Sequence, residues 1–198
     1  MKSRTSQAVV AIASAALAIS GCGLIGDAGN ESKRETNVNM QEAGDRAEQI
    51  LDGTLAGIKP AVEARRGPSS DPICTDFKGD GTGTGSVTRR RYVMTIISDE
   101  RRGSFLGVVE RQWKKKGYEI TTVREHKEMP AIFASTPEGF RISLEFGYKG
   151  QAFLDATSPC VAESRVTEAP REPLDPNSEA SKRLPYIRSD FWSADKPL

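Results

Sequence analysis

Apolar residues recur at helical spacing between Asn39 and Ile58. The members of this stripe are Met40, Ala43, Ala47, Ile50, Leu51, Leu55 and Ile58. Asn39 can cap the first turn, and Glu42 stands three residues later, where a capping box needs it. Pro60 limits the far end. The pattern predicts an amphipathic helix over 39–58, followed by a loop over 59–72 that is rich in Pro, Gly and Ser.

In the next part of the chain, the apolar residues first alternate as in a strand and then recur at helical spacing. Ser86–Ile97 alternates and predicts a long strand, with Arg89 and Arg91 on one face and Tyr92 on the other. Ser98–Gly103 is expected to be a charged turn. Apolar residues return at helical spacing between Ser104 and Lys116, at Phe105, Leu106, Val109 and Trp113. A second helix is therefore predicted over 104–116, with Gly117 at its end.

Four alternating segments follow, separated by turn residues. They are Tyr118–Glu125, Ala131–Ser135, Phe140–Gly147 and Gln151–Thr157. Consecutive short strands form antiparallel meanders, and a meander that alternates apolar and polar residues needs covering on one face only. The sequence thus predicts an α+β fold: an antiparallel meander sheet of four to five strands, with two helices packed on one face.

A glycine-rich segment, Gly79–Gly85, precedes the first long strand. Phosphate-binding loops have defined glycine spacings and a helix behind them, and neither is present here. A calcium loop needs more carboxylates than Asp76 and Asp80 supply. The segment is expected to be a flexible lead-in or a bulged sheet edge.

The N-terminal segment has the pattern of an export signal. Lys2 and Arg4 precede an apolar run, Ala8–Ile19, that is too short to span a membrane. Ile19, Ser20, Gly21 and Cys22 follow, and with this tetrapeptide the chain resembles bacterial lipoprotein precursors. The resemblance implies cleavage before Cys22, acylation of its thiol, membrane lipid as a partner, and a location on the outer face of the cell membrane or within a periplasm. The alternative is an ordinary secretory signal cleaved nearby.

These features divide the chain into four parts. We expect a signal peptide over 1–21, a flexible tether over 22–37, one α+β domain over 38–164, and a Pro-rich, largely disordered tail over 165–198. Within the tail, Tyr186–Trp192 is unusually aromatic. It could dock on the domain, serve as a partner-binding motif, or share the disorder of its surroundings.

The chain contains three cysteines. With Cys22 lipidated and the compartment oxidising, Cys74 and Cys160 are expected to form a disulfide. The alternative is a thiol pair for metal or redox chemistry, but no C-x-x-C spacing is present and His126 is the single histidine. No metal site and no cofactor are predicted.

Charge is unevenly distributed along a chain whose net charge is only +1. Residues 86–127 contain 11 Lys and Arg against 5 Asp and Glu, whereas both flanks are acidic. The residues that could form one basic face are Arg89, Arg90, Arg91, Arg101, Arg102, Arg111, Lys114, Lys115 and Lys116. Such a face would suit anionic lipid, an envelope polymer or an acidic membrane protein. Location disfavours nucleic acid, and a solvated charged surface is the alternative.

No catalytic residues are predicted. His126 lies among charged neighbours in a turn, and the Asp99–Glu100 pair is followed by Arg101 and Arg102, so ion pairing is simpler than acid–base catalysis. The function expected is that of a non-catalytic binding or accessory module. The alternative is a carrier of a small ligand or lipid, with a cleft between the helices and the sheet.

The segment Ser86–Cys160 is also similar to small exported lipoproteins of actinobacteria, in particular the LppA-like group. The residues that carry the resemblance are Arg90-Arg91-Tyr92, Trp113 with Gly117-Tyr118, Pro137-Glu138-Gly139 and Ser158-Pro159-Cys160. The resemblance implies an envelope protein without assigned catalysis, and it supplies no active-site residues.

Overall fold

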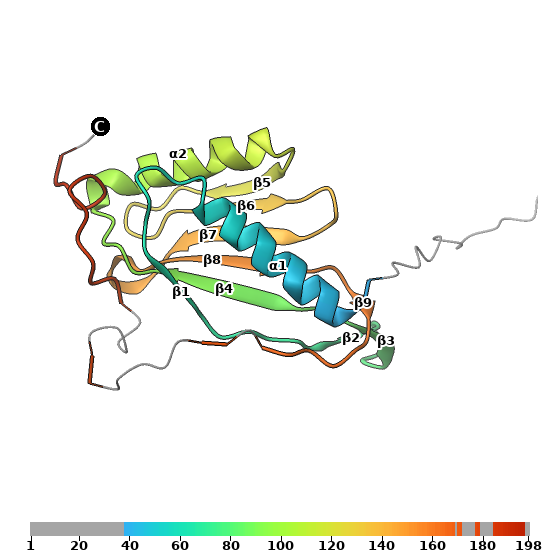
Figure 1. Cartoon of the computed structure of the whole chain (residues 1–198). Helices are drawn as coiled ribbons and strands as arrows, with labels where there is room; N and C mark the ends of the chain where they lie inside the picture. Colours follow the sequence, from blue (N-terminus) through green and yellow to red (C-terminus); the bar gives the residue numbers. More distant parts are fainter. Residues whose placement is uncertain (1–37, 169, 172–176, 179–183, 197–198) are drawn as a thin grey trace, which may run out of the picture. The chain divides into compact units, whose positions relative to one another are not determined.

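The computed structural model describes residues 38–168, 170–171, 177–178 and 184–196. The predicted signal peptide, the tether and Cys22 lie outside this range. Within it, none of the helices has the length and apolar character needed to cross a membrane. Two α-helices lie on one face of a large antiparallel sheet, and a small sheet lies at one end (Figure 1). The predicted α+β class is therefore confirmed.

The elements occur in the following order along the chain. They are α1 (Met40–Leu55), β1 (Ala64–Arg66), β2 (Ile73–Thr75), β3 (Gly81–Gly85), β4 (Thr88–Val93), α2 (Asp99–Lys115), β5 (Glu119–Arg124), β6 (Ala131–Ser135), β7 (Arg141–Phe146), the 3₁₀ turn η1 (Tyr148–Gly150), β8 (Ala152–Thr157) and β9 (Val161–Ala162).

The first helix begins as its sequence predicts. The Asn39 side chain accepts a hydrogen bond from the Glu42 N–H at 3.0 Å, and the Glu42 carboxylate accepts one from the Asn39 N–H at 3.0 Å. This capping box satisfies two N–H groups that have no partner within the helix. The helix ends at Leu55 rather than at Ile58, although Ile58 remains fully buried in the core.

The large sheet has six strands in the order β1-β4-β8-β7-β6-β5, so the predicted size of four to five strands is too small. The additional edge strand is β1, which lies inside the segment 59–72 that was expected to be a loop. Its three residues pair with β4, Ala64 opposite Val93 and Arg66 opposite Arg91. A strand of three residues with two arginines has no alternation of apolar and polar positions that could predict it. It forms because its backbone pairs with β4.

The second helix begins five residues earlier than predicted, so the expectation of a charged turn over 98–103 is wrong. Asp99 and Glu100 occupy the first turn, where acidic side chains interact favourably with the helix dipole. Ser98 does not cap the helix through its side chain, because its hydroxyl donates to the Ala194 carbonyl at 2.6 Å. The helix stops at Gly117 as predicted, with φ at 77°.

The core lies between the helices and the inward face of the sheet. Pairing places Leu154 opposite both Arg91 and Leu144, and Leu144 opposite Ile132, so these side chains share that inward face. Trp113 fills the space between the helices and is 1% exposed. Its indole N–H donates to the Thr54 hydroxyl at 3.0 Å, so the helix interface contains no unpaired indole donor.

The small sheet has the order β2-β3-β9 and contains the predicted disulfide. Cys74 and Cys160 are bonded, with their Cα atoms 6.3 Å apart. The glycine-rich segment forms β3, and the β2–β3 pairing shifts register between Ile73 and Thr75. Neither a flexible lead-in nor a sheet edge is observed: β3 lies between β2 and β9 and pairs with both, and only its pairing with β2 is irregular.

The aromatic segment near the C-terminus docks on the domain. The backbone N–H groups of Tyr186 and Ile187 both donate to the Met94 carbonyl, and the Ile96 N–H donates to Ile187. Trp192 is fully buried, and its indole N–H donates to the Pro60 carbonyl at 2.7 Å. The expectation of a largely disordered tail is thus wrong for residues 184–196, because an aromatic side chain there completes the core.

Candidate anion-binding groove

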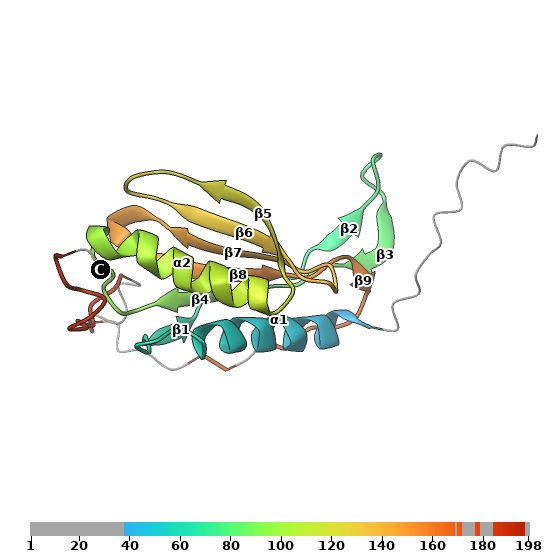
Figure 2. The same cartoon turned by 90° about the horizontal axis from the view of Figure 1, so that it is seen from above.

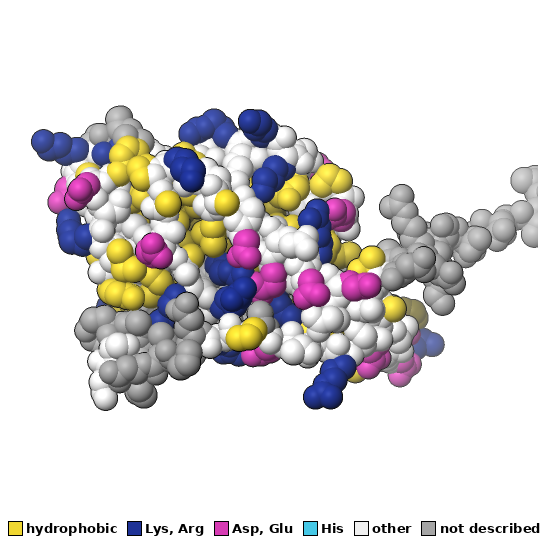
Figure 3. Space-filling model, viewed as in Figure 1, with side chains coloured by type: hydrophobic (Ala, Val, Ile, Leu, Met, Phe, Trp, Pro, Cys, Tyr) yellow, Lys and Arg dark blue, Asp and Glu magenta, His cyan; other side chains and the backbone are white. Residues whose placement is uncertain are grey.

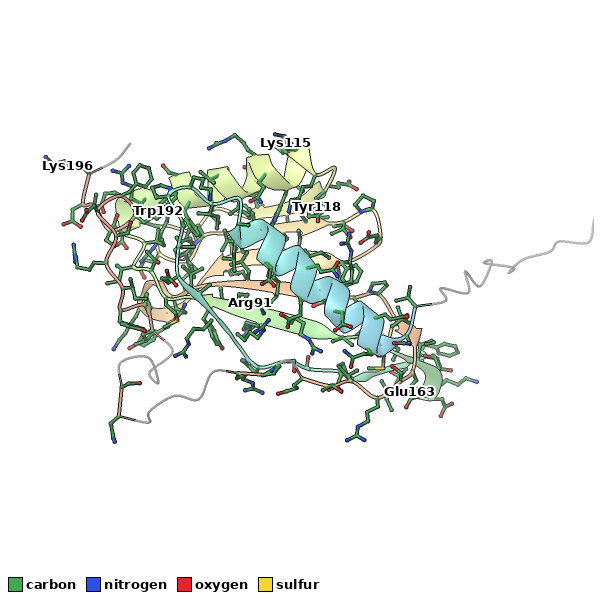
Figure 4. The ribbon with its side chains drawn as sticks, in the orientation of Figure 1. Arg91, Lys115, Tyr118, Glu163, Trp192 and Lys196 are labelled. Carbon is green, nitrogen blue, oxygen red and sulfur yellow. A yellow bond between two sulfur atoms is a disulfide. The ribbon has the colours of Figure 1, made fainter. Side chains whose placement is uncertain are left out.

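The nine basic residues expected to form one face are divided among three places. Because side chains alternate along β4, Arg89 and Arg91 point toward α1, whereas Arg90 points to the uncovered face of the sheet. Arg89 is 3% exposed and Arg91 is 4% exposed. In Figure 4, Arg91 lies beside α1 and Lys115 lies well away from it on α2. The prediction of a single basic face is therefore wrong.

The arginines that point inward share one carboxylate, that of Glu48 on α1. Arg91 forms a hydrogen-bonded ion pair with Glu48 and a second, at 2.8 Å, with Asp52. The Arg89 Nε lies 3.4 Å from Glu48, and the Arg66 Nε lies 3.3 Å from it. Glu48 and Asp52 stand one helical turn apart, so both reach the same side of the sheet. We call Glu48, Asp52, Arg66, Arg89 and Arg91 the Glu48 cluster.

Gly44 permits the close approach of Arg89 to the helix. A Cβ atom at position 44 would lie only 2.8 Å from the Arg89 Nη2. The guanidinium group therefore occupies space that any other residue would take. Its Nε and Nη1 are buried without a hydrogen bond, and its Nη2 donates weakly to the Thr167 carbonyl at 3.4 Å.

Ion pairing between Glu48 and its arginines keeps these side chains charged although they are partly buried. Burial alone would raise the pKa of Glu48, but hydrogen bonding and charge from Arg91, and then from Arg66, outweigh burial and hold the pKa below its usual value. For Arg91, burial again opposes the charge, and the hydrogen bond and charge of Glu48 raise the pKa. Both groups are therefore ionised at neutral pH.

A groove of about 450 Å³ opens beside this cluster, between the C-terminal half of α1 and β1. Its basic residues are Arg65, Arg66, Arg91 and Arg171, and its acidic residues are Asp52 and Glu63, so the lining carries a formal charge of +2. Leu55, Val62 and Tyr92 provide apolar walls. Figure 3 shows acidic side chains along α1 with basic side chains directly beside them. The arrangement suits a ligand with an anionic group and an apolar part.

Arg90 forms its contacts on the opposite face of the sheet. It forms a two-pronged ion pair with Asp155, at 2.7 and 2.5 Å, and this pairing raises the pKa of Arg90. Its guanidinium carbon also lies 4.7 Å from the centroid of the Phe153 ring. Pair and stacking together hold Arg90 against the sheet, so it is not available to the groove.

The remaining predicted residues lie on α2. Arg101 and Arg102 are 7% and 8% exposed: Arg101 lies 4.9 Å from the centroid of the Phe191 ring, and Arg102 donates to the Glu128 carbonyl at 2.7 Å. Only Arg111, Lys114, Lys115 and Lys116 are exposed. Arg111, Lys114 and Lys115 form a solvated surface on α2, where Lys114 is paired with Glu110. Lys116 follows the end of the helix, and its ammonium group reaches α1 beside Gly53.

Sequence reasoning missed Glu48, Asp52, Arg65, Arg66 and Arg171 as members of this region. One signal was present: Glu48 and Asp52 border the apolar stripe of the predicted helix at a spacing of four. Carboxylates in that position need cations from the surface on which the helix packs. The three consecutive arginines of β4 were the available source.

His126 is exposed, as expected from its neighbours, and its Nδ1 accepts the backbone N–H groups of Glu128 and Met129. Among the described residues, no group of three or more His, Cys, Asp or Glu side chains is arranged to hold a metal ion.

Acid is expected to destabilise the fold through Glu48. A carboxyl group whose pKa is lowered by folding contributes stability that is complete above its unfolded pKa, near 4.5, and is lost as the pH falls through the folded value. The free energy of unfolding, measured with urea, should therefore fall as the pH is lowered below about 5. The Glu48→Gln variant should show a shallower fall over this range. An unchanged slope in that variant would contradict the role of Glu48.

No protein-family model matches the sequence, and no curated protein matches it. A solved structure, the crystal structure of a DUF4853 family protein from Actinomyces odontolyticus ATCC 17982, is similar with a TM-score of 0.41 and 12% sequence identity. The similarity covers 77% of this chain and 78% of that chain.

Proposed function

We propose that this protein is an envelope lipoprotein, anchored through acylated Cys22 to the outer face of the cell membrane, that binds an anionic envelope polymer without catalysis. The observation that carries the binding role is the groove beside α1, where four arginines meet two carboxylates. Anchoring is supported by the tetrapeptide Ile19-Ser20-Gly21-Cys22 and by the disulfide, which is typical of exported proteins.

Arginine suits the proposed ligand because its planar fork of N–H groups matches carboxylate and phosphate oxygens. Arg66 and Arg171 stand at the rim with side-chain exposures of 42% and 46%, in ion pairs with Glu48 at 3.3 Å and Glu168 at 2.5 Å. Arg91 lies deeper, paired with Glu48 and Asp52, and its side chain is 5% exposed. An anionic group would therefore be met first by the rim residues, and the inner ion pairs would hold the wall in place.

The filled core favours this role over that of a carrier. A lipid or small apolar ligand would need space between the helices and the sheet. Trp113, Phe105, Leu51 and Leu144 occupy that space, and each is at most 1% exposed. The groove opens outside this layer and has a largely polar lining.

Soluble polyanions test the groove. The mature chain is titrated with polyphosphate and, separately, with polygalacturonate, so that phosphate and carboxylate recognition are distinguished. Removing two rim cations by Arg66→Ser with Arg171→Ser should weaken binding by about tenfold or more, because a hydrogen bond to a charged group contributes roughly 1.5–3 kcal/mol.

The matched control removes two cations from the exposed face of α2, by Lys114→Ser with Lys115→Ser. This variant has the same net charge as the rim variant and should bind nearly as tightly as the wild-type protein. Equal losses in the two variants would show that binding follows net charge alone, and the proposed groove would be abandoned.

The anchor is tested separately by mass spectrometry of the protein isolated from its own membranes. We expect a mature N-terminus at Cys22 carrying two acyl chains, the number needed for stable anchoring. The Cys22→Ser variant should leave the membrane fraction. An unmodified Cys22 in the native protein would refute this part of the proposal.

A further inference from the structure

The most exposed large apolar side chain of the small sheet lies at the tip of the β2–β3 hairpin. Phe77 is 93% exposed, and Ile73 on the same hairpin is 55% exposed. The tip is well ordered by hydrogen bonds: the Asp76 carboxylate accepts the backbone N–H groups of Lys78 at 2.8 Å and Asp80 at 3.0 Å. The fold therefore holds this aromatic ring in water, where it contributes nothing to the core.

The base of the hairpin is fixed to the domain. Cys74 in β2 is bonded to Cys160, and β3 pairs with β9 through Gly85 and Val161. The Thr82 hydroxyl donates to the Cys74 carbonyl at 2.9 Å, across the two strands. Figure 2 shows the hairpin projecting away from the large sheet. A covalent link at its base makes it a rigid projection.

The same end of the domain receives the predicted tether. Asn39, which caps α1, forms a β-bridge with Ala162 of β9, and β9 pairs with β3 of the hairpin. Residues 23–37 separate Cys22 from the described chain, and a flexible segment of this length has a root-mean-square span of about 20 Å. An acylated Cys22 would therefore keep the base of the hairpin close to the bilayer.

We propose that Phe77 inserts into the lipid interface and gives the anchored domain a second contact with the membrane. This inference rests on the proposed lipid anchor. The contact is apolar, because Asp76, Lys78 and Asp80 give the tip a charge of −1, which an anionic leaflet would not attract. The Lys78 ammonium lies 5.5 Å from the centre of the Phe77 ring, and its flexible stem lets it remain among the headgroups.

Insertion would also hold the anion-binding groove at a distance from the hairpin tip. The groove lies at the C-terminal half of α1, and the hairpin base lies beside its N-terminus. The helix has 16 residues, a length of about 24 Å. With Phe77 in the bilayer, the groove would lie about one helix length from the base of the hairpin.

The test places a fluorescent reporter at the tip. The lipidated Phe77→Trp protein is reconstituted into zwitterionic vesicles, with and without brominated acyl chains that quench tryptophan. We expect emission from the introduced indole to shift to shorter wavelength and to be quenched, at low and at high salt alike. The native Trp113 and Trp192 are buried and provide a constant background.

Tyr148→Trp is the matched control. Tyr148 is 75% exposed in η1, which precedes the start of β8. The small sheet lies beyond the other end of β8, where β9 follows that strand. This reporter should remain unquenched. Quenching at neither position would overturn the proposed insertion while leaving the anchor intact, and equal quenching at both would show an unoriented domain. Failure of the anchor itself is identified independently by the mass of Cys22.

Discussion

Replacement of Trp192 by alanine is expected to lower the free energy of unfolding by about 3–5 kcal/mol, as large-to-small changes of buried aromatic residues do. The side chain is fully buried. Its ring meets Phe105 edge-on with centroids 5.0 Å apart, and meets Phe191 in the same way at 4.8 Å. The variant also loses the indole hydrogen bond to Pro60 and leaves that carbonyl without this donor.

The measurement is urea unfolding of the wild-type and variant chains, with Tyr186→Ala as the matched control. Tyr186 belongs to the same docked segment but is 42% exposed, so its loss should cost less than about 1 kcal/mol. Similar small losses in both variants would mean that the C-terminal segment does not complete the core. A large loss in Trp192→Ala alone would confirm that it does.

The burial of Trp192 could not be predicted from the sequence alone. The aromatic run 186–192 was recognisable because a disordered tail rarely contains so many rings. The surface on which this run docks was not recognisable, because Phe105 and Pro60 are distant in sequence and no periodicity connects them to the tail. Docking was therefore one of three alternatives from sequence, and the hydrogen bonds to Met94 and Pro60 select it.

Elements with strong local signals were predicted well. The capping box at Asn39 and the alternation of Phe140–Gly147 depend on neighbouring residues only, and the structure has both the capping box and a strand over Arg141–Phe146. Stop signals were nearly as informative, since Gly117 adopts the positive φ that ends α2. The disulfide followed from the number of cysteines and the expected compartment, and Cys74 and Cys160 are bonded.

Elements defined by tertiary partners were missed. The strand β1 has no pattern of its own and exists because Ala64–Arg66 pair with β4. The first turn of α2 was predicted to be a charged turn, because Asp99 to Arg102 are all ionisable. In the structure, Arg102 is paired with Asp99 and lies 5.4 Å from the centre of the Phe146 ring. Such contacts make the charged segment helical and bury Arg101 and Arg102, and local composition cannot reveal them.

The same limitation explains the error about the basic face. Clustering in sequence does not imply clustering in space on a strand, because neighbouring side chains point to opposite faces. Arg90 and Arg91 are adjacent in sequence, yet one pairs with Asp155 on the uncovered face and the other with Glu48 beneath α1. The alternation was predicted, but which face α1 would cover was not.

Loss of the Glu48 carboxylate is the other change for which we expect a large effect. In Glu48→Ala, Arg89 would keep the long contact to Thr167, and Arg91 would keep Asp52 and a long contact to the Arg90 carbonyl at 3.4 Å. The side chains of these arginines are 4% and 5% exposed. Removing one partner from a buried ion pair typically costs about 3–5 kcal/mol, because the remaining charge stays desolvated. Thermal and urea unfolding should both report a loss of this size.

Two further variants separate this cause from simple truncation of a helix residue. Glu110→Ala removes a carboxylate from an exposed pair with Lys114 on α2, and it should cost less than about 0.5 kcal/mol. Glu48→Leu combined with Arg89→Met and Arg91→Met removes both charges together with their partner. Because buried ion pairs can be exchanged for apolar residues of similar volume at little cost, this triple variant should recover most of the stability lost in Glu48→Ala. If it is less stable than Glu48→Ala, the arginines stabilise the fold by packing and hydrogen bonds rather than through their pairing with Glu48.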